Sequence, residues 1–221
     1  MADHTLNTTP CITIDSDLPF YEGIAITDIV LVTSPEAACD AWQDLLAQEV
    51  IGFDTESKPT FSKGEVSGGP HLVQLATATR VYLFPVDRLP DLPGLKAVLE
   101  SKQILKVGFG LDSDLAQLNS RLGINAQNIL DLSRALRSET GHQSLGAKSA
   151  VAKYFGRRLQ KSKRTSTSNW ANSRLTERQI LYAANDAQVA LRVYCAALLS
   201  APMLRDASLD GCTQRGKPLR K

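Results

Sequence analysis

The sequence contains an apolar run that ends in two carboxylates, Val50-Ile-Gly-Phe-Asp-Thr-Glu56. Side chains alternate between the two faces of a strand, so Asp54 and Glu56 are expected to point to the same side at the end of a buried strand. Neighbouring carboxylates repel each other unless a cation, a proton or a basic group lies between them, which indicates a divalent metal site with oxygen ligands. The alternative is a strand that runs into a polar loop, with two solvated acids.

Strands and helices are predicted on both sides of this run. Upstream, a β-rich segment at Ile24–Thr33 precedes a helix that begins with Ser34 as N-cap and ends near Gln48. Downstream, two strands joined by a turn, His71–Thr77 and Val81–Pro85, are followed by strands that alternate with helices. These later strands are in Ile104–Gly110, which ends in a glycine-bracketed turn, and in Asn128–Leu132. Antiparallel strands followed by strand–helix units predict an α/β fold with a mixed sheet flanked by helices.

A chain of 221 residues suits one domain with tails. We expect a flexible N-terminal arm at 1–22, a folded domain at 23–200 and a basic C-terminal tail at 201–221. No apolar stretch is long enough to span a bilayer, and the N-terminus lacks a basic start followed by an apolar block, so a cytoplasmic location is expected. The four cysteines are scattered and indicate neither a zinc site nor a disulfide framework.

Charge is divided unevenly along the chain. Residues 1–150 contain 11 Lys and Arg against 19 Asp and Glu, whereas residues 151–221 contain 14 against 4. A basic segment on an otherwise acidic domain is the electrostatic feature expected where phosphate backbones are bound, although a basic tail is also compatible with a solubilising appendage.

Asp114 stands out on the helix predicted around Leu111–Leu122. The helix carries an apolar stripe that packs on the sheet, formed by Leu111, Leu115, Leu118 and Leu122. Asp114 lies beside this stripe, whereas Asp112 is assigned to the helix cap. A carboxylate at the margin of a core needs a partner, and a metal shared with Asp54 and Glu56 would serve. Pairing with a nearby Arg or Lys is the alternative.

The last long helix is predicted to begin at Thr176, with Gln179 at capping-box spacing, and to run to about Leu199. It carries two apolar stripes, so both of its sides are expected to be packed. Tyr182 and Asp186 are neighbours at i and i+4, which places a phenol beside an acid. Several alanines would let this helix approach the sheet closely, namely those at 183, 184, 187 and 190.

In this order, the acids and the tyrosine resemble the pattern of the DEDDy 3′–5′ exonucleases, the group that contains RNase D and the Werner syndrome exonuclease domain. The matching set is Asp54-x-Glu56, then Asp114 within Val107-Gly-Phe-Gly-Leu-Asp-Ser-Asp-Leu115, then Tyr182-Ala-Ala-Asn-Asp186. Connecting stretches such as Leu72-Val-Gln-Leu-Ala76 and Ser168-Asn-Trp170 also look like the Werner-type branch. The similarity covers residues 24–200.

The resemblance implies an RNase H-like three-layer sandwich, with 23–200 as a 3′–5′ exonuclease domain. It implies two divalent cations, Mg²⁺ or Mn²⁺, held by Asp54, Glu56, Asp114 and Asp186, and hard oxygen ligands suit such cations. It also implies catalytic roles for Glu56 and Tyr182, with Tyr182 orienting the water that attacks the terminal phosphodiester and releases a nucleoside 5′-monophosphate. A phenol with a pKa near 10 is a poor base at neutral pH, so positioning is the expected role.

A basic stretch leads into the Tyr182 helix and consists of Arg157, Arg158, Lys161, Lys163 and Arg164. We expect these cations to bind the backbone of single-stranded or 3′-unpaired nucleic acid without sequence preference. A solvated loop is the alternative. Trp170 is expected to anchor this loop by packing. The sequence does not distinguish DNA from RNA, because the discriminating contacts are to the 2′ position, and it indicates neither a membrane partner nor an oligomeric state.

Two further hypotheses stand beside the exonuclease. In one, the protein is a catalytically silent nucleic-acid-binding member of the same fold, for which loss of a metal-binding acid is the expected sign; here all four acids and the tyrosine are present. In the other, the phosphodiester chemistry belongs to an RNA-processing scaffold whose tails bind a larger complex. The sequence disfavours the first of these and leaves the second open.

Overall fold

The computed structural model of the protein describes residues 17–60, 68–136 and 144–200. The first sixteen residues of the predicted arm and the whole of the predicted basic tail therefore lie outside the described residues.

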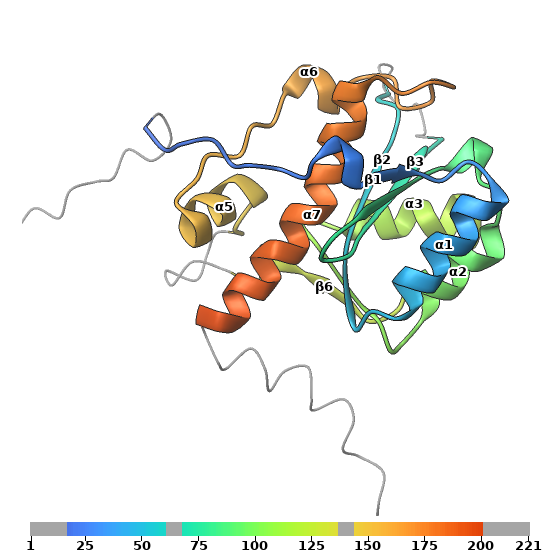
Figure 1. Ribbon diagram of the computed structural model, residues 1–221, viewed down its shortest axis with the longest axis horizontal. Helices are drawn as coiled ribbons and strands as arrows, with labels where there is room; N and C mark the ends of the chain where they lie inside the picture. The colour runs from blue at the N-terminus through green and yellow to red at the C-terminus, as the bar shows by residue number, and fades with distance from the viewer. Residues whose placement is uncertain (1–16, 61–67, 137–143, 201–221) are drawn as a thin grey trace, which may run out of the picture.

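A mixed sheet forms the middle layer of the domain (Figure 1). In the described part of the chain it has six strands in the order β1-β4-β3-β2-β5-β6. β3 runs antiparallel to both of its neighbours, whereas the other pairs are parallel. The strands are β1 (Ile29–Leu31), β2 (Val50–Glu56), β3 (Leu72–Ala76), β4 (Val81–Pro85), β5 (Leu105–Gly108) and β6 (Ile129–Asp131).

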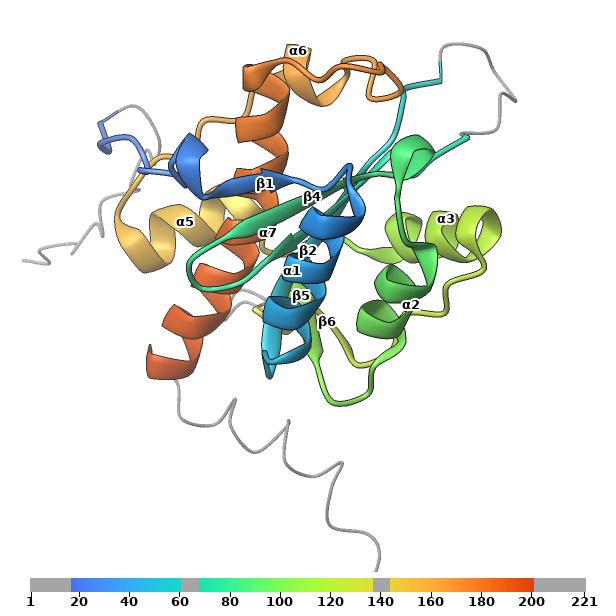
Figure 2. The ribbon, with the colours of Figure 1, turned by 45° about the vertical axis from the view of Figure 1, so that its right-hand side comes forward.

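Helices cover both faces of this sheet. The helical segments are η1 (Ile26–Asp28), α1 (Pro35–Leu46), η2 (Val86–Arg88), α2 (Leu92–Glu100), α3 (Asp112–Leu122), α4 (Leu132–Ala135), α5 (Ala147–Phe155), α6 (Lys163–Ser166) and α7 (Glu177–Ser200). α1, α2 and α3 lie on one side of the sheet, and α7 crosses the other side with α5 beside it (Figures 1 and 2). The predicted three-layer arrangement of a mixed sheet flanked by helices is confirmed.

Local sequence explains where the two best-defined helices begin. The Ser34 hydroxyl accepts a hydrogen bond from the backbone N–H of Ala37 (3.2 Å), and Pro35 occupies the first helical position of α1. At the start of α7, Thr176 and Gln179 form the predicted reciprocal cap. The Gln179 N–H donates to the Thr176 hydroxyl (3.3 Å), and the Thr176 N–H donates to the Gln179 side-chain oxygen (3.0 Å).

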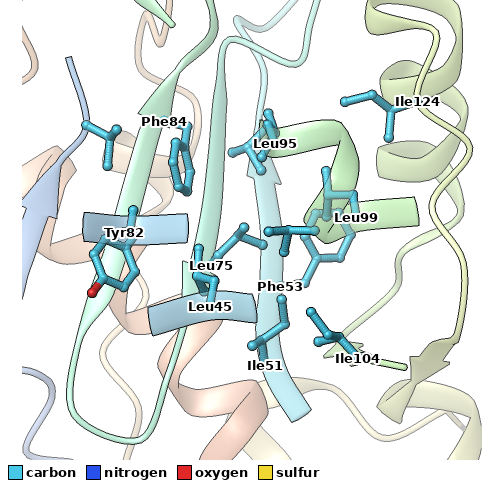
Figure 3. Packing of buried hydrophobic residues seen from close by; sticks show 14 of the residues in the cluster. Leu45, Ile51, Phe53, Leu75, Tyr82, Phe84, Leu95, Leu99, Ile104 and Ile124 are labelled. Atoms are coloured by element: carbon cyan, nitrogen blue, oxygen red, sulfur yellow. The ribbon is translucent and has the colours of Figure 1, made fainter. Parts of the chain in front are cut away.

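The face covered by α1, α2 and α3 is the main hydrophobic core (Figure 3). Ile51 and Phe53 of β2 point into it and are fully buried, as are Leu75 of β3 and Leu95 of α2. These residues of β2 occupy odd positions, so the even positions Gly52, Asp54 and Glu56 point to the α7 face. Burial of this odd-numbered set therefore fixes the direction of the two carboxylates.

α7 packs unusually close to β2 because both partners have small residues where they meet. A Cβ atom at Gly52 would collide with the backbone carbonyl oxygen of Ala187. The predicted alanines at 183, 184, 187 and 190 are all buried. α7 has 24 residues, yet among the described helices none combines the length and apolar character needed to cross a bilayer.

Three details differ from the sequence-based expectations. The β-rich segment Ile24–Thr33 contains only a three-residue strand, which η1 precedes. Leu132 begins α4 instead of ending a strand, because the Asp131 side chain accepts a hydrogen bond from the Ser133 N–H and caps that helix. Part of the predicted arm, residues 17–22, belongs to the described structure, and Tyr21 donates a backbone hydrogen bond to Arg158 (3.0 Å).

Candidate active site

The end of β2 supplies two of the predicted acids. Asp54 and Glu56 lie opposite Gln74 and Leu72 of β3 in the antiparallel register, and both residues are partly exposed. Because alternate residues share a face, both side chains lie on the side of the sheet that α7 covers. α7 approaches β2 closely at Gly52, which brings the helix alongside these acids.

Asp114 joins them from a neighbouring strand–helix unit. β5 pairs in parallel with β2, so the helix that follows it, α3, begins at the same edge of the sheet at which β2 ends. Asp114 lies in the first turn of α3, and its carboxylate accepts a hydrogen bond from the hydroxyl of Thr55. Thr55 sits between Asp54 and Glu56 in sequence, and its buried side chain therefore fixes the third acid relative to the first two.

α7 contributes Asp186 and, one turn earlier, Tyr182. Asp186 is buried, and Tyr182 is partly buried against Trp170, with ring centroids 6.1 Å apart. Trp170 is itself buried and donates its indole N–H to the backbone oxygen of Ser166 (3.1 Å). The indole therefore anchors the loop before α7, as its sequence context predicts, and forms one wall of the Tyr182 position.

Lys161 places a cation among these acids. Its ammonium lies 3.0 Å from one carboxylate oxygen of Asp186. Lys161 belongs to the connection between α5 and α6, which has neither helical nor strand structure at this residue. The side chain thus reaches from that connection to α7.

The four carboxylates sit in an unfavourable electrostatic environment. Burial raises the pKa of Asp54 well above its usual range, and the charges of Asp186 and Asp114 raise it further. Burial, together with the charges of Asp54 and Asp186, raises the pKa of Glu56 to about 9. The charges of neighbouring acids thus make Asp54 and Glu56 harder to ionise.

The pKa values of the other two acids are also raised, but neighbouring groups oppose part of the shift. Burial raises the pKa of Asp114, against a hydrogen bond from Thr55 that favours its charged form. Burial also raises the pKa of Asp186, against the positive charge and the hydrogen bond of Lys161. For Lys161, burial acts to lower the pKa, but the charges of Asp186 and Asp54 outweigh it and raise the pKa.

The phenol of Tyr182 stays protonated in this environment. Burial raises its pKa above the ordinary value of 10, and the negative charges of Asp186 and Glu56 act in the same direction. A phenol that holds its proton is a hydrogen-bond donor and orienting group rather than a base. The positioning role of Tyr182 stays a prediction.

Gln74 is a buried polar residue beside the carboxylates. It is fully buried in β3 directly across from Asp54, and neither polar atom of its amide has a hydrogen-bond partner among the described residues. Burial of an amide without hydrogen-bond partners costs free energy, because its polar atoms lose water and gain no partner in exchange.

The donor chemistry of the cluster fits divalent cations. All four acids offer carboxylate oxygens, the preferred ligands of Mg²⁺ and Mn²⁺, and their mutual repulsion is the term that a bound cation relieves. The Lys161 ammonium shows that a cation is accommodated beside Asp186. Among the described residues, however, no three acidic, histidine or cysteine side chains already stand at the mutual spacing of a metal centre.

The five predicted backbone-binding cations do not gather in one patch. Arg157 lines a cavity of about 670 Å³ together with residues of the C-terminal half of α7, and the four acids are not among its lining residues. Arg158 lies over the ring of Phe20, 4.3 Å from its centroid. Lys161 contacts Asp186, whereas Lys163 and Arg164 are exposed on α6, which packs against α7.

Three residues of the site were not assigned to it from the sequence. Gln74 carried a signal, because it is a polar residue inside a strand that is otherwise apolar, whereas Thr55 was marked only by its place between two of the predicted acids. Lys161 carried none, since nothing in the sequence separates it from the basic residues around it. Its role depends on how the connection from α5 to α6 folds back over α7.

Comparison with known proteins supports the same fold and identifies the family. Residues 29–198 match the profile of the 3′-5′ exonuclease family, a stretch that includes all four acids and Tyr182. The bifunctional 3′-5′ exonuclease/ATP-dependent helicase WRN of Mus musculus is 31% identical over 148 residues, which is 66% of this chain and 11% of that protein. The chain spans about half or less of the length of the curated relatives it matches.

Solved structures of related nucleases superpose on the described domain. The EXO domain of Aedes aegypti Nibbler gives a TM-score of 0.70 at 26% identity, covering 84% of this chain and 97% of that one. Escherichia coli RNase D gives 0.66 at 27% identity, covering 83% and 48% respectively. The family match extends over most of the described domain, which has the fold of an RNase H-like sandwich. The chain therefore belongs to the 3′-5′ exonuclease family.

Proposed function

We propose that this chain is a metal-dependent 3′–5′ exonuclease that hydrolyses the terminal phosphodiester of DNA or RNA and releases nucleoside 5′-monophosphates. The observation that supports this most strongly is the convergence of Asp54, Glu56, Asp114, Asp186 and Tyr182 from β2, α3 and α7 at one edge of the sheet. Carboxylates that raise one another's pKa have no evident structural benefit, so a ligand-binding role accounts for them better.

Two divalent cations, Mg²⁺ or Mn²⁺, would be held by Asp54, Glu56, Asp114 and Asp186. Bound there, they supply charge stabilisation for the attacking and leaving oxygens of an in-line displacement at phosphorus. Thr55 keeps Asp114 oriented through its hydroxyl, and the wall of Trp170 keeps Tyr182 in place. The Tyr182 phenol donates a hydrogen bond that orients the attacking water, and the partly exposed Glu56 carboxylate accepts one from it.

The substrate is proposed to be single-stranded or 3′-unpaired nucleic acid. Lys163 and Arg164 are exposed on α6, next to the helix that carries Tyr182, where cations can contact a phosphate backbone. E. coli RNase D is described as an exoribonuclease involved in structured RNA processing, and the mouse relative as an exonuclease joined to a helicase. RNA and DNA substrates therefore both belong in the test.

The test uses 3′-labelled and 5′-labelled single-stranded DNA and RNA with Mg²⁺, Mn²⁺ or EDTA. We expect 5′-labelled substrate to give a ladder that shortens from the 3′ end, only with metal, and 3′-labelled substrate to release labelled mononucleotide at once. Asp114→Asn should abolish cleavage. Asp112→Asn is the matched control: its exposed carboxylate pairs with Arg134, and it should cleave at the wild-type rate. Binding without cleavage by the wild type would instead support a catalytically silent nucleic-acid-binding protein.

A further inference from the structure

Lys161 makes the most buried carboxylate contact among the ion pairs of the described residues. The Asp186 side chain is 7% exposed, whereas the carboxylates of the other pairs are 12% to 71% exposed. Exposed pairs contribute little to stability, but a charge that loses its partner in a buried setting is costly. Among the ion pairs of the described structure, the one between Lys161 and Asp186 is therefore the pair whose loss should reduce stability most.

The surroundings of Lys161 are negative on the side that faces the sheet. Besides Asp186, the charges of Asp54 and Glu56 act on its ammonium and favour its protonated form. In turn, the Lys161 charge opposes the effect of burial on Asp54 and Glu56. The 3.0 Å contact with Asp186 therefore places the ammonium where it also acts on Asp54 and Glu56.

We propose that Lys161 is a positioning residue that acts as the internal counter-ion of the carboxylates in the metal-free protein, and that a divalent cation competes with its ammonium for Asp186. This inference rests on the proposed function, because it assumes that Asp186 is a metal ligand. Lys161 then holds the acids in place until metal binds, and weakens metal binding by its presence.

The local structure allows this exchange. Lys161 lies in an irregular connection, with buried Leu159 before it and α6, which contains buried Thr165, after it. The backbone on either side is therefore anchored, while the four-carbon side chain can swing away without moving a helix or a strand. Like charges a few ångströms apart repel, so the ammonium cannot keep its contact with Asp186 at full strength once a divalent cation binds the same carboxylate.

The test compares Lys161→Met with the wild type by thermal unfolding in EDTA and over a Mn²⁺ titration. Methionine keeps an unbranched side chain of similar length without the charge. We expect Lys161→Met to unfold about 2 °C or more below the wild type in EDTA. The Mn²⁺ concentration that gives half of the stabilisation should fall by about threefold to tenfold, because the competing charge is gone.

Two further variants make the result specific. Lys161→Arg keeps the charge and should restore the wild-type Mn²⁺ midpoint and stability. Lys96→Met removes an exposed lysine that pairs with Glu100 on α2, and it should leave the Mn²⁺ midpoint unchanged. A Lys161→Met midpoint equal to that of the wild type would overturn the proposal, and so would a weaker midpoint, since both contradict competition.

Failure of this inference is distinguishable from failure of the proposed function. If the wild type binds Mn²⁺ and cleaves from the 3′ end while Lys161→Met has an unchanged midpoint, the proposed function stands and the counter-ion role of Lys161 is wrong. If the wild type is not stabilised by Mn²⁺ and shows no metal-dependent cleavage, both are wrong. A loss of cleavage in Lys161→Met with an unchanged Mn²⁺ midpoint would assign Lys161 to substrate contact, which also overturns the counter-ion role.

Discussion

Tyr182 provides the sharpest test of a single side chain. Its phenol is held between Trp170 and Asp186, and burial keeps it protonated. Tyr182→Phe removes only the hydroxyl, so the packing against Trp170 should survive. We expect the cleavage rate to fall by about 100-fold with little change in substrate affinity, since a positioned donor contributes about that much to a rate. Single-turnover cleavage and a binding titration would check this, and a wild-type rate would exclude the hydroxyl from the reaction.

Glu56 should give the metal-free protein a characteristic pH dependence. Its folded-state pKa is about 9 and its unfolded reference is 4.5, so the folded state holds the proton more tightly between these values. The Glu56 contribution to stability is therefore fully present below pH 4.5 and is lost as the pH rises towards 9. In EDTA, wild-type stability should decline over this range. Glu56→Gln should decline less and be more stable by about 2 kcal/mol at pH 9.

Denaturant unfolding at several pH values, in EDTA, measures this directly. Near the lower end of the range the variant and the wild type should be nearly equal, because the carboxyl is then protonated in both the folded and the unfolded state. A variant whose pH profile runs parallel to that of the wild type would show that Glu56 ionises normally.

At the scale of elements, the contact between β2 and α7 sets the distance between the acids. Gly52→Ala adds a methyl group against the carbonyl oxygen of Ala187, and the two nearest atoms belong to the Ala187 backbone, which cannot rotate away. We expect a loss of stability of about 1–3 kcal/mol, typical of overpacking, and a loss of cleavage because α7 moves Asp186 away from Asp54. Ala78→Gly, in the exposed turn between β3 and β4, is a control that should retain activity.

Normal cleavage by a stably folded Gly52→Ala variant would show that the spacing of β2 and α7 is not critical. A variant that is less stable but still folded, and inactive, is the expected outcome. Circular dichroism at the assay temperature, recorded beside the cleavage rate, separates inactivity of the folded form from simple unfolding.

The sequence predicts long, strongly patterned elements well because a single local cause dominates in each. The reciprocal cap of Thr176 and Gln179 and the run from Val50 to Glu56 both appear where their sequence places them. The segment Ile24–Thr33 is different. Its β-branched residues favour a strand, but β1 pairs only with β4 over three residues, so a tertiary contact decides its length.

At the scale of the whole molecule, the order of the strands explains why distant acids meet. β2 and β5 are adjacent and parallel although they are separated by two strands in sequence, and this brings the start of α3 to the end of β2. Sequence spacing alone indicated the types of ligand. Their convergence was expected only from the family resemblance, because neither strand's sequence indicates that β2 pairs with β5.

The uneven division of charge along the chain does not show which cations bind a nucleic-acid backbone. Three cations of the basic C-terminal part have different surroundings. Arg157 lines a cavity, Arg158 lies over an aromatic ring, and Lys161 contacts a buried carboxylate. Composition cannot reveal such differences, because each cation's role depends on which surface its loop crosses. Backbone binding therefore remains a prediction that the exposed Lys163 and Arg164 support best.

Asp54, Glu56, Asp114 and Asp186 are proposed to form one site for two divalent cations. The most direct test of this site is to count bound Mn²⁺ by electron paramagnetic resonance, in the wild type and in Asp54→Asn, with Asp112→Asn as the control. We predict two Mn²⁺ per chain in the wild type and the control, and a loss of at least one in Asp54→Asn. Equal Mn²⁺ binding by all three proteins, or none by the wild type, would contradict the account.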